Sequence, residues 1–155
     1  MNRVVSFSIA FLAIGIDRLL KWYVSACLSL NETRPLIGQV IRLTRVHNTG
    51  SAMGILPGGS TLFLVISLAV SLVIVSLLVM RRYESRIMST GLALLLGGAV
   101  GNLIDRVVYG YVLDFLEIRG LFVNNLADIC ISVGTALIII HVMFGGERKS
   151  NFEAG

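Results

Sequence analysis

Three aspartates, Asp105, Asp114 and Asp128, stand at or near the ends of apolar segments in one 24-residue stretch of the chain. A carboxylate beside a membrane-sized apolar segment is costly to desolvate and by default indicates a functional site. Two carboxylates held close together cannot easily both ionise, so one keeps a proton while the other loses it. Such a pair can activate water and protonate an amide leaving group, which is the chemistry of an aspartic peptidase.

Polar residues at helical spacing accompany these acids. Asn102, Asp105 and Arg106 are related by i, i+3 and i+4, and Asn125 and Asp128 by i, i+3, so each set shares a helix face. Acids that only marked the edge of a membrane would not need such neighbours. We expect the amide and guanidinium groups to hold a substrate carbonyl or to orient an acid.

The residues leave two candidates for the partner of Asp128. Asp105 adjoins Arg106, which is expected to keep it ionised and therefore a poor proton shuttle. Asp114 lies among apolar residues with no cation before Arg119, and such neighbours favour the protonated form. A hairpin between Asp114 and Asp128 would also bring these two together, so Asp114 is favoured.

Composition indicates a membrane protein. The 155 residues are 55% hydrophobic and 14% charged, and the mean hydropathy is +0.86. These values predict a multi-span protein with a single domain over residues 1–155. The net charge of +4 fits arginines in loops, and no basic run with interleaved aromatics occurs, so a nucleic-acid partner is not expected.

Four apolar runs are long enough to span a bilayer. A core about 30 Å thick requires roughly 20 residues at about 1.5 Å each. The runs cover about residues 4–23, 60–80, 87–104 and 129–146. The first resembles a signal peptide that ends in a lipoprotein-like box at Cys27, but Asp17, Arg18 and Lys21 interrupt it, so we expect a retained helix.

Basic residues predict the orientation of these helices. They lie before the first run, between the second and third, and after the fourth: Arg3, Arg81, Arg82, Arg86, Arg148 and Lys149. The positive-inside rule then places both termini in the cytoplasm and the connections 24–59 and 105–128 outside. This orientation brings Asp17, Asp105, Asp114 and Asp128 to one depth, near the outer face.

The outer connections carry strand patterns. Residues 39–46 are rich in β-branched residues and end in a small-residue turn at 47–54, and residues 112–118 and 121–123 form a predicted hairpin around Arg119-Gly120. The predicted fold is therefore mainly α, with four transmembrane helices and a small outer β-sheet. Gly97 and Gly101 predict close helix packing.

Other kinds of site have weaker signals. Ser51 lacks a nucleophile-elbow context, and a lone His141 in an apolar run is more often structural than a ligand. Cys27 and Cys130 lack metal-type spacing. Asp105, Asp114 and Asp128 could together bind magnesium, but an acid pair can polarise water unaided, so no metal and no cofactor is expected.

Five ordered blocks resemble those of the bacterial lipoprotein signal peptidases (signal peptidase II). They are residues 17–21 (DRLLK), 48–52 (NTGSA), 97–106 (GGAVGNLIDR), 112–115 (VLDF) and 125–128 (NLAD). The resemblance spans the whole chain. The sequence departs from the usual pattern at Leu20, Met53 and Asn124 and in a short hairpin, positions that bear on loop shape and substrate preference.

The resemblance implies an inner-membrane aspartic endopeptidase that removes the signal peptide from diacylglyceryl-modified prolipoproteins, just before the lipid-modified cysteine. It implies Asp114 and Asp128 as the catalytic pair, four helices with an outer β-cradle, and an active site toward the outer face. The implied polar shell consists of Asp17, Lys21, Asn48, Gly50, Asn102, Asp105, Arg106 and Asn125.

Two other classes remain open on the residues alone. A proton-coupled transporter could use the acids as a proton relay, although such a relay requires polar residues that continue along the helices to the cytoplasmic side. A non-enzymatic membrane scaffold would not need acids gathered at one depth. For the peptidase we expect prolipoproteins and membrane lipids as partners and a monomeric state.

Overall fold

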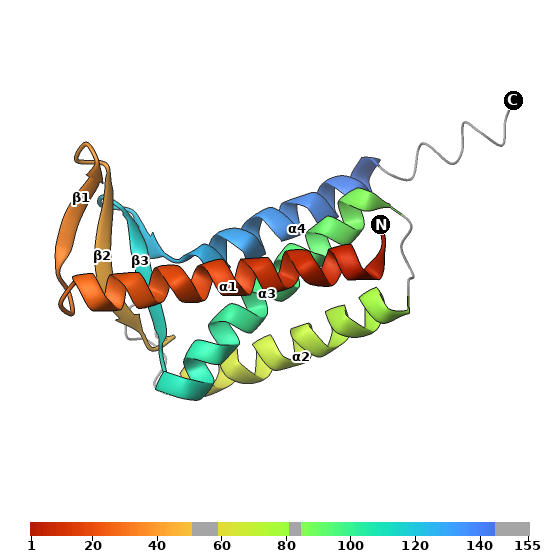
Figure 1. Cartoon of the computed structure of the whole chain (residues 1–155), viewed down its shortest axis with the longest axis horizontal. Coiled ribbons are helices and arrows are strands. Elements are labelled where there is room, and N and C mark those ends of the chain that lie inside the picture. The colour runs from red at the N-terminus through yellow and green to blue at the C-terminus, as the bar shows by residue number, and fades with distance from the viewer. Residues whose placement is uncertain (51–58, 81–84, 145–155) are drawn as a thin grey trace, which may run out of the picture.

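The computed structural model describes residues 1–50, 59–80 and 85–144. Helices run side by side and a small sheet lies across one end of them (Figure 1). The elements in chain order are α1 (Arg3–Cys27), β1 (Thr33–Ile37), β2 (Ile41–Asn48), α2 (Gly59–Val79), α3 (Arg86–Tyr109), β3 (Val112–Ile118), β4 (Phe122–Asn124) and α4 (Leu126–Phe144).

The four predicted helices are all present, but three of them extend beyond the apolar runs at the sheet end. α1 continues to Cys27, α3 continues to Tyr109, and α4 already begins at Leu126. α3 ends where Gly110 adopts a left-handed conformation with φ 78°, a common helix terminator. An apolar run in the sequence marks only the part of a helix that contacts lipid. The helix itself continues beyond that part until it is capped. The acids predicted at helix ends therefore lie inside helices.

Small residues let α3 pack tightly at the centre of the bundle. A Cβ on Gly97 would lie 2.7 Å from the Cβ of Ala13 in α1, and one on Gly98 would lie 2.3 Å from the carbonyl oxygen of Ala127 in α4. Neither distance can accommodate a side chain. The prediction that the glycines of this helix serve close packing is confirmed, and this packing sets the first turn of α4 against α3.

We predict that Gly98→Ala destabilises the protein although alanine is the better helix former. The added Cβ meets backbone oxygen, which no rotamer change relieves, and overpacking of this kind typically costs about 1–3 kcal/mol. Gly15→Ala is the matched control, because nothing lies within 4 Å of its added Cβ. Thermal unfolding midpoints in detergent should fall for Gly98→Ala and hold or rise for Gly15→Ala; equal midpoints would contradict the packing argument.

The sheet is antiparallel with strand order β1-β2-β3-β4. The predicted strand at 39–46 corresponds to β2, and the predicted hairpin corresponds to β3 and β4, so both are confirmed. β1 was not predicted: its five residues are all exposed and include Pro35, as an edge strand tolerates. The pairing of β2 with β3 sets Val46 opposite Asp114 and Asn48 opposite Val112. Asn48 of β2 therefore lies diagonally across from Asp114.

Three helices in the described ranges are long and apolar enough to cross a membrane, Thr61–Val79, Arg86–Tyr109 and Leu126–Phe144. The predicted count of four spans is thus not confirmed. α1 is long enough but carries Asp17, Arg18 and Lys21 in one turn, and Asp17 and Lys21 are buried within the bundle. Hydropathy counts these charges as if they faced lipid.

Several residues that supported the predictions lie outside the described ranges. They are Ser51 and Met53, the turn residues 51–54, and the basic residues Arg81, Arg82, Arg148 and Lys149.

Candidate active site

Asp114 and Asp128 meet at the sheet end of the bundle through the side chain of Asn125. Asn125 is fully buried, and its Nδ2 donates to Oδ1 of Asp114 at 2.7 Å. Its Oδ1 accepts from the backbone N–H of Asp128 at 2.9 Å. Asp114, in β3, is 2% exposed, whereas Asp128 is partly exposed. One carboxyl is therefore withdrawn from solvent while the other is open to it.

The same asparagine begins α4. The backbone N–H of Asn125 donates to Oδ2 of Asp128 at 3.3 Å, which completes a reciprocal capping box with the bond just described. Asp17 adds a second cap from α1, because its Oδ1 accepts from the N–H of Ala127 at 3.1 Å. Asp128 therefore stands in the first turn of a capped helix, where the helix dipole favours a negative charge.

Two further amides hold the carboxylates. Nδ2 of Asn102, in α3, donates to Oδ1 of Asp128 at 2.7 Å, and Nδ2 of Asn48, in β2, donates to Oδ2 of Asp114 at 2.9 Å. The backbone N–H of Gly50 donates to Oδ1 of Asn48 at 2.9 Å, which turns the donor end of that amide toward Asp114. Gly50 has φ 79°, a conformation that favours glycine.

Burial raises the pKa of Asp114 from its ordinary value to about 6. The cost of desolvating the carboxylate is the largest cause, and the nearby charge of Asp128 raises the pKa further. The amides of Asn48 and Asn125 lower it and offset part of that rise. The expectation that the surroundings of Asp114 favour its protonated form is confirmed in direction.

A second cluster, which we call the ion cluster, consists of Asp17, Arg18, Lys21 and Asp105. Asp105 accepts from Arg18 at 2.6 Å and from Lys21 at 2.7 Å. Asp17 pairs with Lys21, four residues further along α1, at 2.8 Å and with Arg18 at 3.2 Å. Oδ2 of Asp105 also accepts from the N–H of Leu113 at 3.2 Å, which ties β3 to the cluster.

The expectation that Arg106 would keep Asp105 ionised was wrong about the partner. In the part of the chain that the structure describes, the cations within 4.0 Å of Asp105 are Arg18 and Lys21 of α1. Arg106 instead donates to the carbonyl oxygen of Asn102 at 3.4 Å and lies 5.4 Å from the ring centre of Phe63. Arg18 was missed as a site residue, although its place beside Asp17 in an apolar run was a signal.

Lys21 joins the two clusters. Its Nζ reaches Oδ1 of Asn102 at 3.4 Å in addition to Asp17 and Asp105. Nδ2 of Asn125 reaches the same oxygen at 3.2 Å. Because two donors occupy that oxygen, the Nδ2 of Asn102 must face Asp128. The structure thus brings together every predicted site residue, in two connected groups, with Arg106 at their edge.

The geometry does not support a three-aspartate metal site. Both oxygens of Asp105 are taken by cations, away from Asp114 and Asp128. Over residues 1–50, 59–80 and 85–144, no three acidic, histidine or cysteine side chains are grouped to hold a metal ion. His141 contacts Ser85, the cap of α3, at 3.2 Å, which fits its predicted structural role. Cys130 is a buried free thiol.

Comparisons with known proteins agree with this arrangement. The model of the family "Signal peptidase (SPase) II" matches residues 9–144. The lipoprotein signal peptidase of Halothermothrix orenii is 40% identical over 141 residues, covering 88% of this chain and 93% of that protein. That of Bacillus subtilis is 37% identical over 147 residues, covering 92% and 96%.

A solved bacterial membrane enzyme is similar in structure, with a TM-score of 0.84 and 28% identity over 94% of this chain and 91% of that one. No comparison supports a transporter. The match over most of the chain, together with the membrane-spanning helices and the paired aspartates, shows that this integral membrane protein belongs to the signal peptidase II family.

Proposed function

We propose that Asp114 and Asp128 are the catalytic pair of this protein, which as a member of the signal peptidase II family is a lipoprotein signal peptidase and a hydrolase. In this proposal Asp128, the more exposed acid, takes a proton from the attacking water. Asp114, the buried acid, supplies a proton to the leaving amide nitrogen. The bond cleaved lies just before the diacylglyceryl-modified cysteine of the prolipoprotein.

The observation that carries this proposal is the unequal environment of two carboxyls that both accept hydrogen bonds from Asn125. Asp114 is buried with a raised pKa, and Asp128 lies in the first turn of α4. Asn125 contacts both residues. When the environments of two titratable groups push their pKa values apart, one group can act as the acid and the other as the base.

The other residues have supporting roles in the proposal. Asn48, Asn102 and Asn125 orient the two carboxyls, and Gly50 orients Asn48. Lys21, Asp17 and Asp105 fix the helix ends that present them. Arg106 lies at the edge of the site, where its Nη1 donates to the carbonyl oxygen of Asn102, and its guanidinium has the role of holding a substrate carbonyl.

The direct test is cleavage by the purified protein. A prolipoprotein carrying the diacylglyceryl group should be cut just before its modified cysteine, as mass spectrometry of the products can determine. The same prolipoprotein without the lipid is the control and should be cut poorly. Cleavage elsewhere, or none, would contradict the proposal.

We predict that kcat/KM declines as pH rises through about 6. The raised pKa of Asp114, about 6, means that its carboxyl holds a proton below this pH and loses it above. A proton donor is then lost as pH rises. Bound substrate excludes water from the pair and raises this pKa further, so kcat should decline at higher pH than kcat/KM. A kcat/KM that is constant across this range would exclude Asp114 as the donor.

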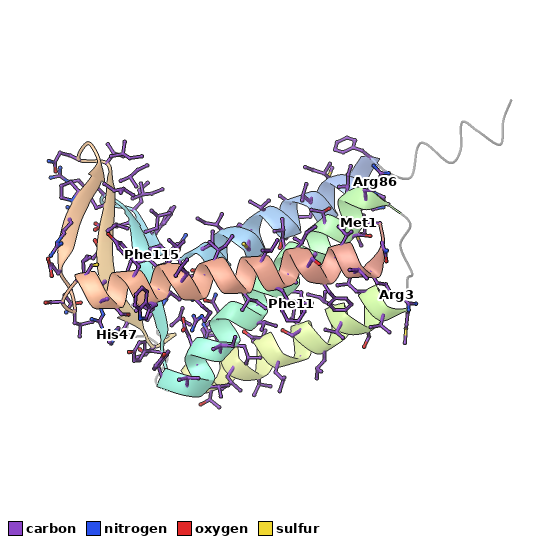
Figure 2. The ribbon with its side chains drawn as sticks, viewed as in Figure 1. Met1, Arg3, Phe11, His47, Arg86 and Phe115 are labelled. Atoms are coloured by element: carbon purple, nitrogen blue, oxygen red, sulfur yellow. The ribbon has the colours of Figure 1, made fainter. Side chains whose placement is uncertain are left out.

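We further propose a single domain with four membrane-spanning helices in the bacterial inner membrane, acting as a monomer. Phe11, Leu12 and Leu19 of α1 are more than 60% exposed on the outside of the bundle, which supports α1 as the fourth span. Arg3 and Arg86 lie at the end of the bundle opposite His47 and Phe115 of the sheet (Figure 2). The positive-inside rule therefore favours cytoplasmic termini and an outer sheet.

Cysteine labelling tests this orientation. We predict that single cysteines at Gln39 and Arg119, both exposed near turns of the sheet, react with a membrane-impermeant maleimide added from outside. A cysteine at Arg3, at the opposite end of α1, should react only after the membrane is opened. Cys27 and Cys130 are replaced by serine first. The reverse pattern of labelling would overturn the orientation.

A further inference from the structure

A cavity of about 310 Å³ lies on the side of the ion cluster, between α1, α3 and the sheet. Neither Asp114 nor Asp128 lines it, so it is separate from the proposed catalytic pair. Its lining combines basic and aromatic side chains: Arg18, Lys21 and Arg45, with Trp22, Tyr109 and Tyr111. Neither Arg45 nor any of these aromatic residues has a role in the proposed reaction.

The charges at this cavity do not balance. Arg18 and Lys21 share the carboxylates of Asp17 and Asp105. Arg45 is a third cation, and in the described ranges no carboxylate lies within 4.0 Å of it. One positive charge is therefore left over, which is costly in a partly buried place unless an anion accompanies it.

Arg45 also has hydrogen-bonding capacity left. Its Nη1 donates to the carbonyl oxygens of Ser25 at 3.1 Å and Leu28 at 3.0 Å, at the end of α1. Its Nε is buried and has no hydrogen-bond partner among the described residues. Capping α1 thus uses one nitrogen, while a buried donor that lacks a partner calls for an acceptor. Guanidinium groups match the oxygens of phosphate especially well.

The aromatic rim indicates where such an anion would come from. Trp22 is 68% exposed and Tyr109 is 57% exposed. Tryptophan and tyrosine with one side in solvent are typical of the membrane–water interface, at the level of lipid headgroups. Both residues lie near the ends of α1 and α3 that meet the sheet. The anion that the bilayer itself supplies at this depth is the phosphate of a lipid headgroup.

We propose that this cavity binds the phosphodiester of a phospholipid headgroup, with Arg45 as its main ligand. A phosphodiester carries one negative charge, which balances the one cation left over. Its oxygens can accept from the guanidinium of Arg45, which lines the cavity, while the acyl chains lie against the lipid-facing sides of α1 and α3. A lipid bound here would join α1, α3 and β2 beside the ion cluster. This inference does not depend on the assignment of the catalytic pair.

The test is the thermal unfolding midpoint of the purified protein in a neutral maltoside detergent. Phosphatidylglycerol should raise the midpoint in a saturable way. Diacylglycerol with the same acyl chains lacks the phosphodiester and should not raise it, and inorganic phosphate at millimolar concentration should not either. An equal effect of diacylglycerol would overturn the headgroup site, and an equal effect of inorganic phosphate would overturn the lipid as its source.

Variants locate the site. Arg45→Gln should weaken the apparent affinity for phosphatidylglycerol by about tenfold or more, as expected for a lost charge-assisted hydrogen bond. Arg34→Gln is the matched control: it removes an exposed arginine of β1 that is paired with Glu32. Its response should equal that of the wild type. If Arg45→Gln and the wild type respond equally, the proposal fails.

A second pair of variants keeps the test valid if loss of Arg45 prevents folding. Ser25 also lines the cavity. Ser25→Glu places a carboxylate near Arg45, which would supply the missing counter-charge and repel a phosphate. The response to phosphatidylglycerol should be lost while folding is kept, and Ser25→Gln, of the same size, should still respond. A full response by Ser25→Glu would overturn the site.

Discussion

Asp114→Asn and Asp128→Asn are each expected to abolish cleavage of a lipid-modified prolipoprotein. General acid–base catalysis contributes roughly 10²–10⁴-fold, and losing either acid stops a proton transfer that the other cannot perform, so turnover should fall by at least that factor. The substitution keeps the side-chain shape and one acceptor oxygen, which can still accept from Asn125. Only the hydrogen bond from Asn48 to residue 114, or from Asn102 to residue 128, is lost. Membrane insertion and lipopeptide binding should therefore change little.

Asp105→Asn is the matched control for these variants. It removes a carboxylate from the same end of the bundle, but one whose partners are Arg18 and Lys21 rather than the catalytic pair. We expect lower stability or weaker binding, with turnover retained in the folded fraction. Turnover, lipopeptide binding and thermal stability should be measured for all three variants. Appreciable turnover by Asp114→Asn, with a stable, binding but inactive Asp105→Asn, would reverse the assignment.

The sequence was most informative about the candidate site because its chemistry is local. The i, i+3 spacing of Asn125 and Asp128 indicated that the two are neighbours, but Asn125 precedes α4 and forms a capping box with Asp128 instead of sharing a helix face with it. The apolar neighbours of Asp114 predicted the direction of its raised pKa. The partners of Asp105 could not be predicted this way, because Arg18 and Lys21 lie more than 80 positions away in the sequence. Arg106 is adjacent to Asp105 in the sequence, but Arg18 and Lys21 are the cations paired with it in the structure.

The fold was predicted where periodicity and length carry the signal. The helices, β2 and the hairpin of β3 and β4 follow from their apolar and β-branched patterns. β1 has no such pattern, since every residue in it is exposed and only its pairing with β2 makes it a strand. The helix ends were misplaced because caps such as the one from Asp17 to Ala127 come from a distant part of the chain.

Asp17→Ala is expected to damage the fold more than the chemistry. Asp17 is 1% exposed, pairs with Lys21 and Arg18, and caps α4 at the N–H of Ala127. Alanine would leave two cations to share Asp105 alone and one buried N–H without its acceptor. Removing one partner of a buried ion pair typically costs about 3–5 kcal/mol, because an uncompensated charge remains buried. The unfolding midpoint should therefore fall sharply.

Two variants separate the causes of that loss. Asp17→Asn keeps an oxygen for the N–H of Ala127 but removes the charge, so its unfolding midpoint should lie between those of the wild type and Asp17→Ala. Glu32→Ala breaks the exposed pair with Arg34 and should change the midpoint little. Because the first turn of α4 carries Asp128, folded Asp17→Ala should show a raised KM for the lipopeptide with a smaller change in kcat. Wild-type stability and KM with a much reduced kcat would instead require Asp17 to act directly in the reaction.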